Sequence, residues 1–186
     1  FLKNVLVGYQ PTESLLSMRY LIITAPTFEA GLASFINHKS AQGFTVDVFN
    51  TTTTGTTTTA IKTFIQNRYN DLGTRPEFIL LVGDVQYIPS WIGTGEGNPN
   101  TDLNYVQLAG TDKFADVFIG RFSVTTAQEL QNALSKSIYM ESYIATVAKK
   151  NIFMASTDNY QITEGTHNYV INTHFQPAGW ENLKLY

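Results

Sequence analysis

A run of five apolar residues, Phe78–Val82, ends in Gly83 and Asp84, and this feature restricts the fold more than any other in the chain. A continuous apolar run of this length, closed by glycine, is typical of a strand buried on both faces, as in a parallel sheet. A second run at residues 117–122 has the same character. Open parallel sheets bind ligands at the carboxyl ends of their strands, so Asp84 is expected at a functional edge.

The segments around these runs alternate between strand-like and helix-like patterns. Arg19–Thr24 is rich in β-branched and aromatic residues, residues 28–41 have apolar side chains at helical spacing, and residues 45–49 are again strand-like. A helix between two parallel strands forms a right-handed crossover, and its repetition predicts an α/β fold with a mainly parallel sheet. The remaining predicted elements are helices at 60–69, 125–148 and 164–175, strands at 152–156 and 183–186, a short strand at 105–108, and loops at 51–59 and 90–101.

Three aspartates accompany the two apolar runs. Asp84 follows the first run, whereas Asp112 and Asp116 precede the second, with Phe114 between them. In an extended segment, side chains at alternate positions share a face, so Asp112 and Asp116 are expected to point the same way. Calcium relieves the repulsion of converging carboxylates, which predicts a calcium site here. The alternative is that each aspartate satisfies backbone amides at a strand end or a turn.

Composition excludes several classes of protein. With 186 residues, of which 43% are hydrophobic, the chain can bury a substantial core. A net charge of −3 leaves no basic surface of the kind that binds nucleic acid. No apolar run approaches the roughly 20 residues that span a bilayer, and the first residues do not have the pattern of a signal peptide. The absence of cysteine excludes disulfides and any thiol nucleophile within these residues.

The order of these motifs resembles the catalytic domain of the gingipain family, cysteine peptidases with a caspase-like fold. The resemblance runs from about Tyr20 to Tyr186 and includes the pattern Phe35-Ile36-Asn37-His38-Lys39-Ser40-Ala41-Gln42-Gly43 and both apolar runs. Its most specific part is the sequence Phe-Ile-Gly-Arg-Phe-Ser at residues 118–123. The resemblance implies a caspase-like three-layer sandwich, with a mainly parallel sheet flanked by helices, in a secreted cysteine endopeptidase.

The resemblance also implies roles for individual residues. The calcium ligands of the family correspond to Asp84, Asp112, the carbonyl of Phe114, and Asp116, although relatives have Glu where Asp116 stands. Asp158, after the strand at 152–156, matches the acidic residue that orients the catalytic histidine. The alternative for Asp158 is a turn or helix cap formed with the next residue. Glu164 falls near the acid of the substrate pocket in an arginine-selective relative, which makes it the candidate for substrate binding.

None of the three histidines resembles the catalytic histidine of the family. The resemblance therefore places that histidine and the cysteine beyond Tyr186, in the remainder of the same polypeptide. The expected partners of this chain are that remainder and protein or peptide substrates. The implied organisation is an amino-terminal extension or linker at residues 1–18, a first α/β subdomain at 19–148, and the start of the catalytic subdomain at 149–186. The fragment alone is expected to be inactive.

Two further interpretations stay open. A catalytically inactive gingipain-like module acting as a surface or assembly domain has the same sequence pattern. A flavodoxin-like domain that binds a ligand at the carboxyl edge of its sheet is the third interpretation, but the chain has no phosphate-binding motif to support it.

Overall fold

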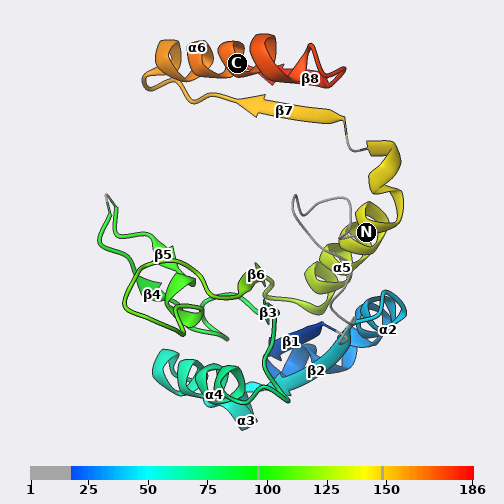
Figure 1. The fold of residues 1–186 in the computed structure, drawn as a ribbon, viewed down its shortest axis with the longest axis vertical. Coiled ribbons are helices and arrows are strands. Elements are labelled where there is room, and N and C mark those ends of the chain that lie inside the picture. Colours follow the sequence, from blue (N-terminus) through cyan, green and yellow to red (C-terminus); the bar gives the residue numbers. More distant parts are fainter. Residues whose placement is uncertain (1–17, 96, 148) are drawn as a thin grey trace. The chain divides into compact units, whose positions relative to one another are not determined.

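The computed structural model describes residues 18–95, 97–147 and 149–186 (Figure 1). Most of the predicted extension, residues 1–18, therefore lies outside the described residues. The chain forms two compact units, one up to Ser135 and one at Lys136–Tyr186. This division falls within a helix, whereas the sequence placed the boundary after it, at residue 148. The start of that helix contributes the buried Leu130 and Leu134.

The first unit is built around a four-stranded sheet in the order β2-β1-β3-β6, with every neighbouring pair parallel. The predicted strands of the sheet and the predicted helices beside it are present, with shifts of a few residues at their ends. The strands are β1 (Arg19–Thr24), β2 (Thr45–Asn50), β3 (Phe78–Val82) and β6 (Phe118–Phe122), and the helical segments are α1 (Pro26–Glu29), η2 (Ala30–Leu32), α2 (Ala33–Ala41), α4 (Thr58–Asn70) and α5 (Ala127–Val147).

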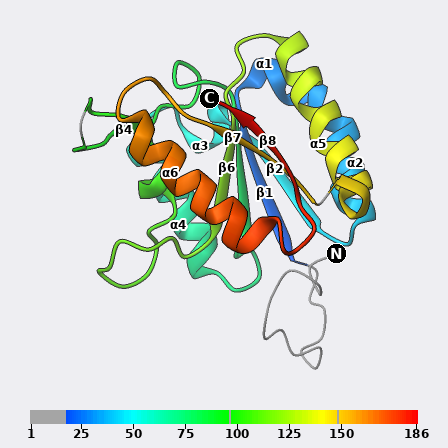
Figure 2. The ribbon, with the colours of Figure 1, turned by 90° about the horizontal axis from the view of Figure 1, so that it is seen from above.

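Helices cover both faces of this sheet, with α4 on one side and α2 on the other (Figure 2). On the α4 side, Ile61 and Ile65 pack with Leu21 and Leu81 into a core whose members are almost inaccessible to solvent. On the α2 side, the ring of Phe35 meets Tyr20 and Phe122 edge to face. A parallel sheet is stable when both of its faces are covered. The alternation of strands and helices along the sequence provides the helices that cover them. The α/β fold predicted from the sequence is confirmed.

Three local predictions were wrong. Residues 51–59 were expected to be a loop, but they contain the short helix α3 (Thr51–Thr54), because the side chain of Asn50 accepts a hydrogen bond from the Thr52 amide and caps it. The loop at 90–101 contains an antiparallel hairpin, β4 (Trp91–Ile92) with β5 (Asn100–Thr101). Residues 105–108 are not a strand: a 3₁₀ turn, η3 (Leu103–Tyr105), leads into them.

The second unit contains a parallel pair of strands, β7 (Lys150–Met154) and β8 (Glu181–Leu185). Helix α6 (Tyr160–Val170) and a following π-helical turn, η4 (Ile171–Phe175), connect them. The helical segments pack on one face of the pair through Phe153, whose ring lies 5.2 Å from that of His167 and 5.9 Å from that of Phe175, measured between centroids. This β-α-β order is the one predicted from the sequence, with α6 beginning four residues earlier than expected.

Candidate functional site

Asp158 lies in the loop between β7 and α6, just beyond the carboxyl end of β7. The partner strand β8 ends at the same level, because Met154 pairs with Leu185. Side chains in this loop are therefore presented at the carboxyl edge of a parallel pair, where α/β proteins place their functional groups. The position agrees with the role predicted for Asp158, and its catalytic role stays a prediction.

The carboxylate of Asp158 is exposed to solvent and has a hydrogen-bond donor beside it. Its Oδ1 accepts a hydrogen bond from the hydroxyl of Ser156. This bond, together with one from the backbone amide of Asp158 itself, lowers the pKa of the carboxyl group below its usual value. Asp158 is therefore an anion at neutral pH and a ready acceptor for a hydrogen bond from an imidazole N–H.

Glu164 lies on the second turn of α6, after the loop that carries Asp158. Its side chain is half-buried. The two acidic side chains thus belong to one continuous segment that starts at the end of β7. A role for Glu164 in substrate binding stays a prediction.

The four predicted calcium ligands do not form one coordination shell. Asp84 follows β3, and its amide donates to the carbonyl of Val124, so it lies at the carboxyl edge of the sheet. Asp116 precedes the parallel strand β6 and therefore lies at the opposite edge. The five residues of β6 between them span about 16 Å, whereas oxygens bound to one calcium ion lie within about 5 Å of each other. In the described part of the chain, no group of three or more acidic, histidine or cysteine side chains is arranged to hold a metal ion.

The segment that carries Asp112 and Phe114 is a series of bends rather than the extended chain that was predicted. Oδ1 of Asp112 accepts from the amide of Phe114, 2.9 Å away, and both residues are exposed. Asp116 behaves as the alternative interpretation proposed: its Oδ2 accepts from the amides of Leu108 and Ala109, at 2.6 and 2.9 Å. The bonds from Ala109 and then Leu108 are the main reason that the pKa of Asp116 is lowered.

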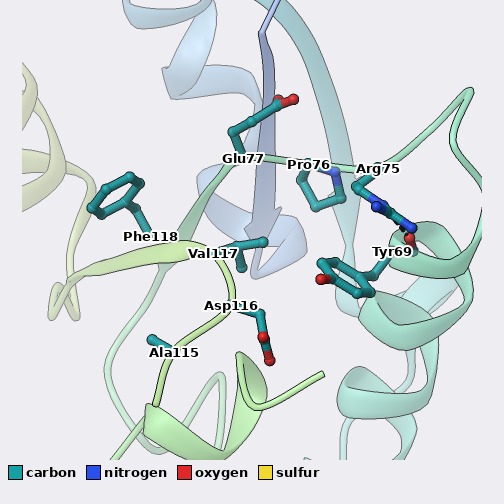
Figure 3. Close-up of a pocket in the computed structure, with 8 residues that line it drawn as sticks. All are labelled: Tyr69, Arg75, Pro76, Glu77, Ala115, Asp116, Val117 and Phe118. Carbon is teal, nitrogen blue, oxygen red and sulfur yellow. Dashed lines mark hydrogen bonds between the residues drawn. The ribbon is translucent and has the colours of Figure 1, made fainter. Parts of the chain in front are cut away.

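Asp116 also borders a groove of about 400 Å³ at the amino edge of the sheet (Figure 3). The groove lies between Arg75, which stacks on the ring of Tyr69, and the start of β6. It is lined by Tyr69, Arg75, Pro76, Glu77, Ala115, Asp116, Val117 and Phe118. This edge is opposite to the one where ligands of open α/β sheets bind.

At the carboxyl edge, the strand order reverses between β1 and β3, which is where a flavodoxin-like domain would bind its ligand. Two aromatic rings occupy this position. Phe28, only 2% exposed, meets Tyr87 edge to face at 5.2 Å between centroids. A Cβ added to Gly83 would lie 3.0 Å from that of Tyr87. The rings pack against the strand end, which disfavours the flavodoxin-like interpretation.

Sequence reasoning missed the role of Arg121, although it lies within the motif at 118–123. Its guanidinium group forms a two-bond ion pair with Asp102, with both N···O distances at 2.7 Å. Its Nη1 also donates to the carbonyls of Gly83 and Ile88, at 2.7 and 2.8 Å. One side chain on β6 therefore fixes the end of β3 and the loop after it. The arginine inside an otherwise apolar strand was the available signal.

The comparisons with known proteins agree with this architecture. The model of the family described as Peptidase family C25 matches residues 13–186. Gingipain R2 of Porphyromonas gingivalis is 30% identical over 151 residues, which cover 80% of this chain and 20% of that protein. Lys-gingipain of the same organism is 30% identical over 183 residues, which cover 91% of this chain and 10% of that protein.

The crystal structure of the Arg-specific cysteine proteinase gingipain R has a TM-score of 0.77 and 28% identity, and the match covers 96% of this chain and 43% of that one. The chain thus spans between a tenth and a fifth of the length of the two curated relatives. The resemblance seen in the motifs is confirmed. Because the family model covers nearly the whole chain, the chain belongs to peptidase family C25.

Proposed function

We propose that this chain is the amino-terminal part of the catalytic domain of a secreted cysteine endopeptidase, to which it contributes the acid that orients the catalytic histidine. The observation that supports this function most strongly is the family match over residues 13–186. The position and ionisation of Asp158, at the end of β7, support its assigned role.

Asp158 acts by accepting a hydrogen bond from the imidazole. A carboxylate in this position selects the tautomer in which the other ring nitrogen can take the proton of a thiol, and it stabilises the imidazolium that results. The thiolate then attacks the peptide carbonyl. Because the 186 residues include no cysteine, the nucleophile belongs to another part of the polypeptide.

Glu164 is proposed to contact the substrate. Its carboxylate follows Asp158 on the same segment, and a negative charge there favours a positively charged substrate side chain. Replacement by Gln in the full-length enzyme should raise KM for substrates with arginine or lysine before the cleaved bond. Substrates with a neutral residue there should be affected little, and equal changes for both classes would exclude this role.

Secretion is part of the proposal. In the described residues, no helix is long and apolar enough to cross a membrane. Fractionation of cells that express the complete gene should recover the peptidase outside the cytoplasm. Recovery from the cytoplasm alone would contradict this part of the proposal.

The activity itself is tested by comparing the full-length protein with the isolated chain. The full-length protein should cleave fluorogenic peptides and be labelled by thiol-directed peptidase inhibitors, whereas the isolated chain should do neither. A folded full-length protein without turnover or labelling would instead favour the inactive module. Turnover by the isolated chain, retained after rigorous purification, would exclude a thiol mechanism that depends on the rest of the protein.

A further inference from the structure

Regular structure flanks the loop that carries Asp158 on both sides. Strand β7 ends at Met154, and α6 begins at Tyr160. Immediately before α6, Asn159 adopts the left-handed conformation, with φ of 50°, and its carbonyl accepts from the amide of Ile162 at 3.0 Å. This conformation is unfavourable for most residues and sets the direction in which the loop enters the helix.

The hydroxyl of Ser156 restricts the side chain of Asp158. It donates to Oδ1 of Asp158, and Oδ2 is not part of this bond. Both residues are exposed, so without the hydroxyl the carboxylate would exchange among rotamers in water. The bond also contributes most to the lowered pKa of Asp158, because it stabilises the charged form.

We propose that Ser156 is a positioning residue for the peptidase reaction, holding one oxygen of Asp158 so that the other is available to the catalytic histidine. This inference rests on the proposed role of Asp158. A carboxylate already held in one rotamer loses less entropy when it aligns with the imidazole. It also restricts the imidazole to a smaller range of orientations. Because Ser156 is proposed to act only through Asp158, its effect belongs to the chemical step and should appear in kcat rather than in KM.

The test is a double-mutant cycle in the full-length enzyme, with kcat and KM measured on a fluorogenic peptide. Ser156→Ala should lower kcat about three- to tenfold, the range for losing one ordinary, solvent-exposed hydrogen bond, and leave KM unchanged. Ser156→Thr keeps the hydroxyl and should restore kcat to within about twofold of wild type. In an Asp158→Ala background, Ser156→Ala should have no further effect, because its target is gone.

Thr157→Ala is the matched control, because it removes the neighbouring exposed hydroxyl of the same loop and should leave kcat unchanged. If Asp158→Ala is slow while Ser156→Ala retains the wild-type kcat, the positioning role is wrong and the role of Asp158 stands. The same holds if Ser156→Ala lowers kcat equally in both backgrounds. If Asp158→Ala itself retains the full kcat, the proposed function of Asp158 fails, and the role of Ser156 fails with it.

Discussion

Arg121 and Asp102 form a two-bond ion pair that joins the edge strand β6 to the loop after β4 and β5. The side chain of Arg121 is only 9% exposed and that of Asp102 21%. Nη1 of Arg121 donates to the carbonyls of Gly83 and Ile88, so the buried charge has acceptors for four of its five N–H groups. Such a charge is stable in a protein interior because its hydrogen bonds are satisfied.

Breaking this pair should destabilise the first unit strongly. Asp102→Asn removes the counter-charge and leaves Arg121 buried and unpaired, which should lower the free energy of unfolding by about 3 kcal/mol. Urea denaturation measures the loss. The matched control is Glu181→Gln, which breaks the exposed ion pair of Glu181 with Lys150 and should change little. Equal effects of the two variants would show that Arg121 does not depend on Asp102.

Gly83 is predicted to tolerate no side chain. Its φ is 135°, a conformation that other residues rarely adopt, and an added Cβ would lie 3.0 Å from the Cβ of Tyr87. Gly83→Ala should therefore lower the free energy of unfolding by about 2 kcal/mol or more. Gly120→Ala on β6, where an added Cβ meets no atom within 4 Å, is the control and should be nearly neutral. A neutral Gly83→Ala in thermal and urea denaturation would contradict the tight packing at this strand end.

Acid should destabilise the protein through carboxylates whose pKa is lowered by hydrogen bonds. The main donors are the Ala109 amide for Asp116 and the Thr125 amide for Glu129. A carboxylate with a lowered pKa in the folded state stabilises that state above its unfolded pKa of about 4, and this contribution disappears as pH falls through the folded pKa. Stability should therefore fall below about pH 4, and less steeply in Asp116→Asn. Identical acid slopes for wild type and variant would contradict the bonds assigned to Asp116.

Calcium binding stays a prediction, restricted by the geometry to the loop of Asp112, Phe114 and Asp116 without Asp84. If this loop binds calcium, the ion should raise the melting temperature relative to EDTA, because it binds only the folded state. Asp112→Asn should weaken that response, whereas Asp84→Asn, at the other edge of the sheet, should leave it intact. Identical melting of the wild type in EDTA and in millimolar calcium would exclude the site.

The sequence predicted the strands of the sheet well because buried parallel strands are continuous apolar runs, as in Phe78–Val82. It grouped Asp84 with Asp112 and Asp116 because all three are close to strands, without regard to strand direction. In parallel strands, an acid before one strand and an acid after its neighbour lie at opposite edges, and this applies to Asp116 and Asp84. The pairing of Arg121 with Asp102 was not predictable, because it depends on the path of an irregular loop.

The segment around Asp158 was located correctly as a strand followed by a loop and a helix, but the hydrogen bond from Ser156 was not foreseen. Ser and Asp two residues apart are common in turns, so their sequence pattern alone does not distinguish a local cap from a held carboxylate. Which of the two applies depends on where β7 ends and where α6 begins. The sequence placed both of these boundaries too late in the chain.

The most direct test of the account is kcat of the full-length enzyme compared with that of its Asp158→Asn variant, measured on the same fluorogenic peptide. Asn cannot stabilise an imidazolium and can hold the wrong tautomer, so kcat should fall by a factor on the order of 10² or more. Because Asp158 is exposed, the melting temperature should hardly change. An unchanged kcat in a folded variant would contradict the central claim and would leave Asp158 as a turn residue.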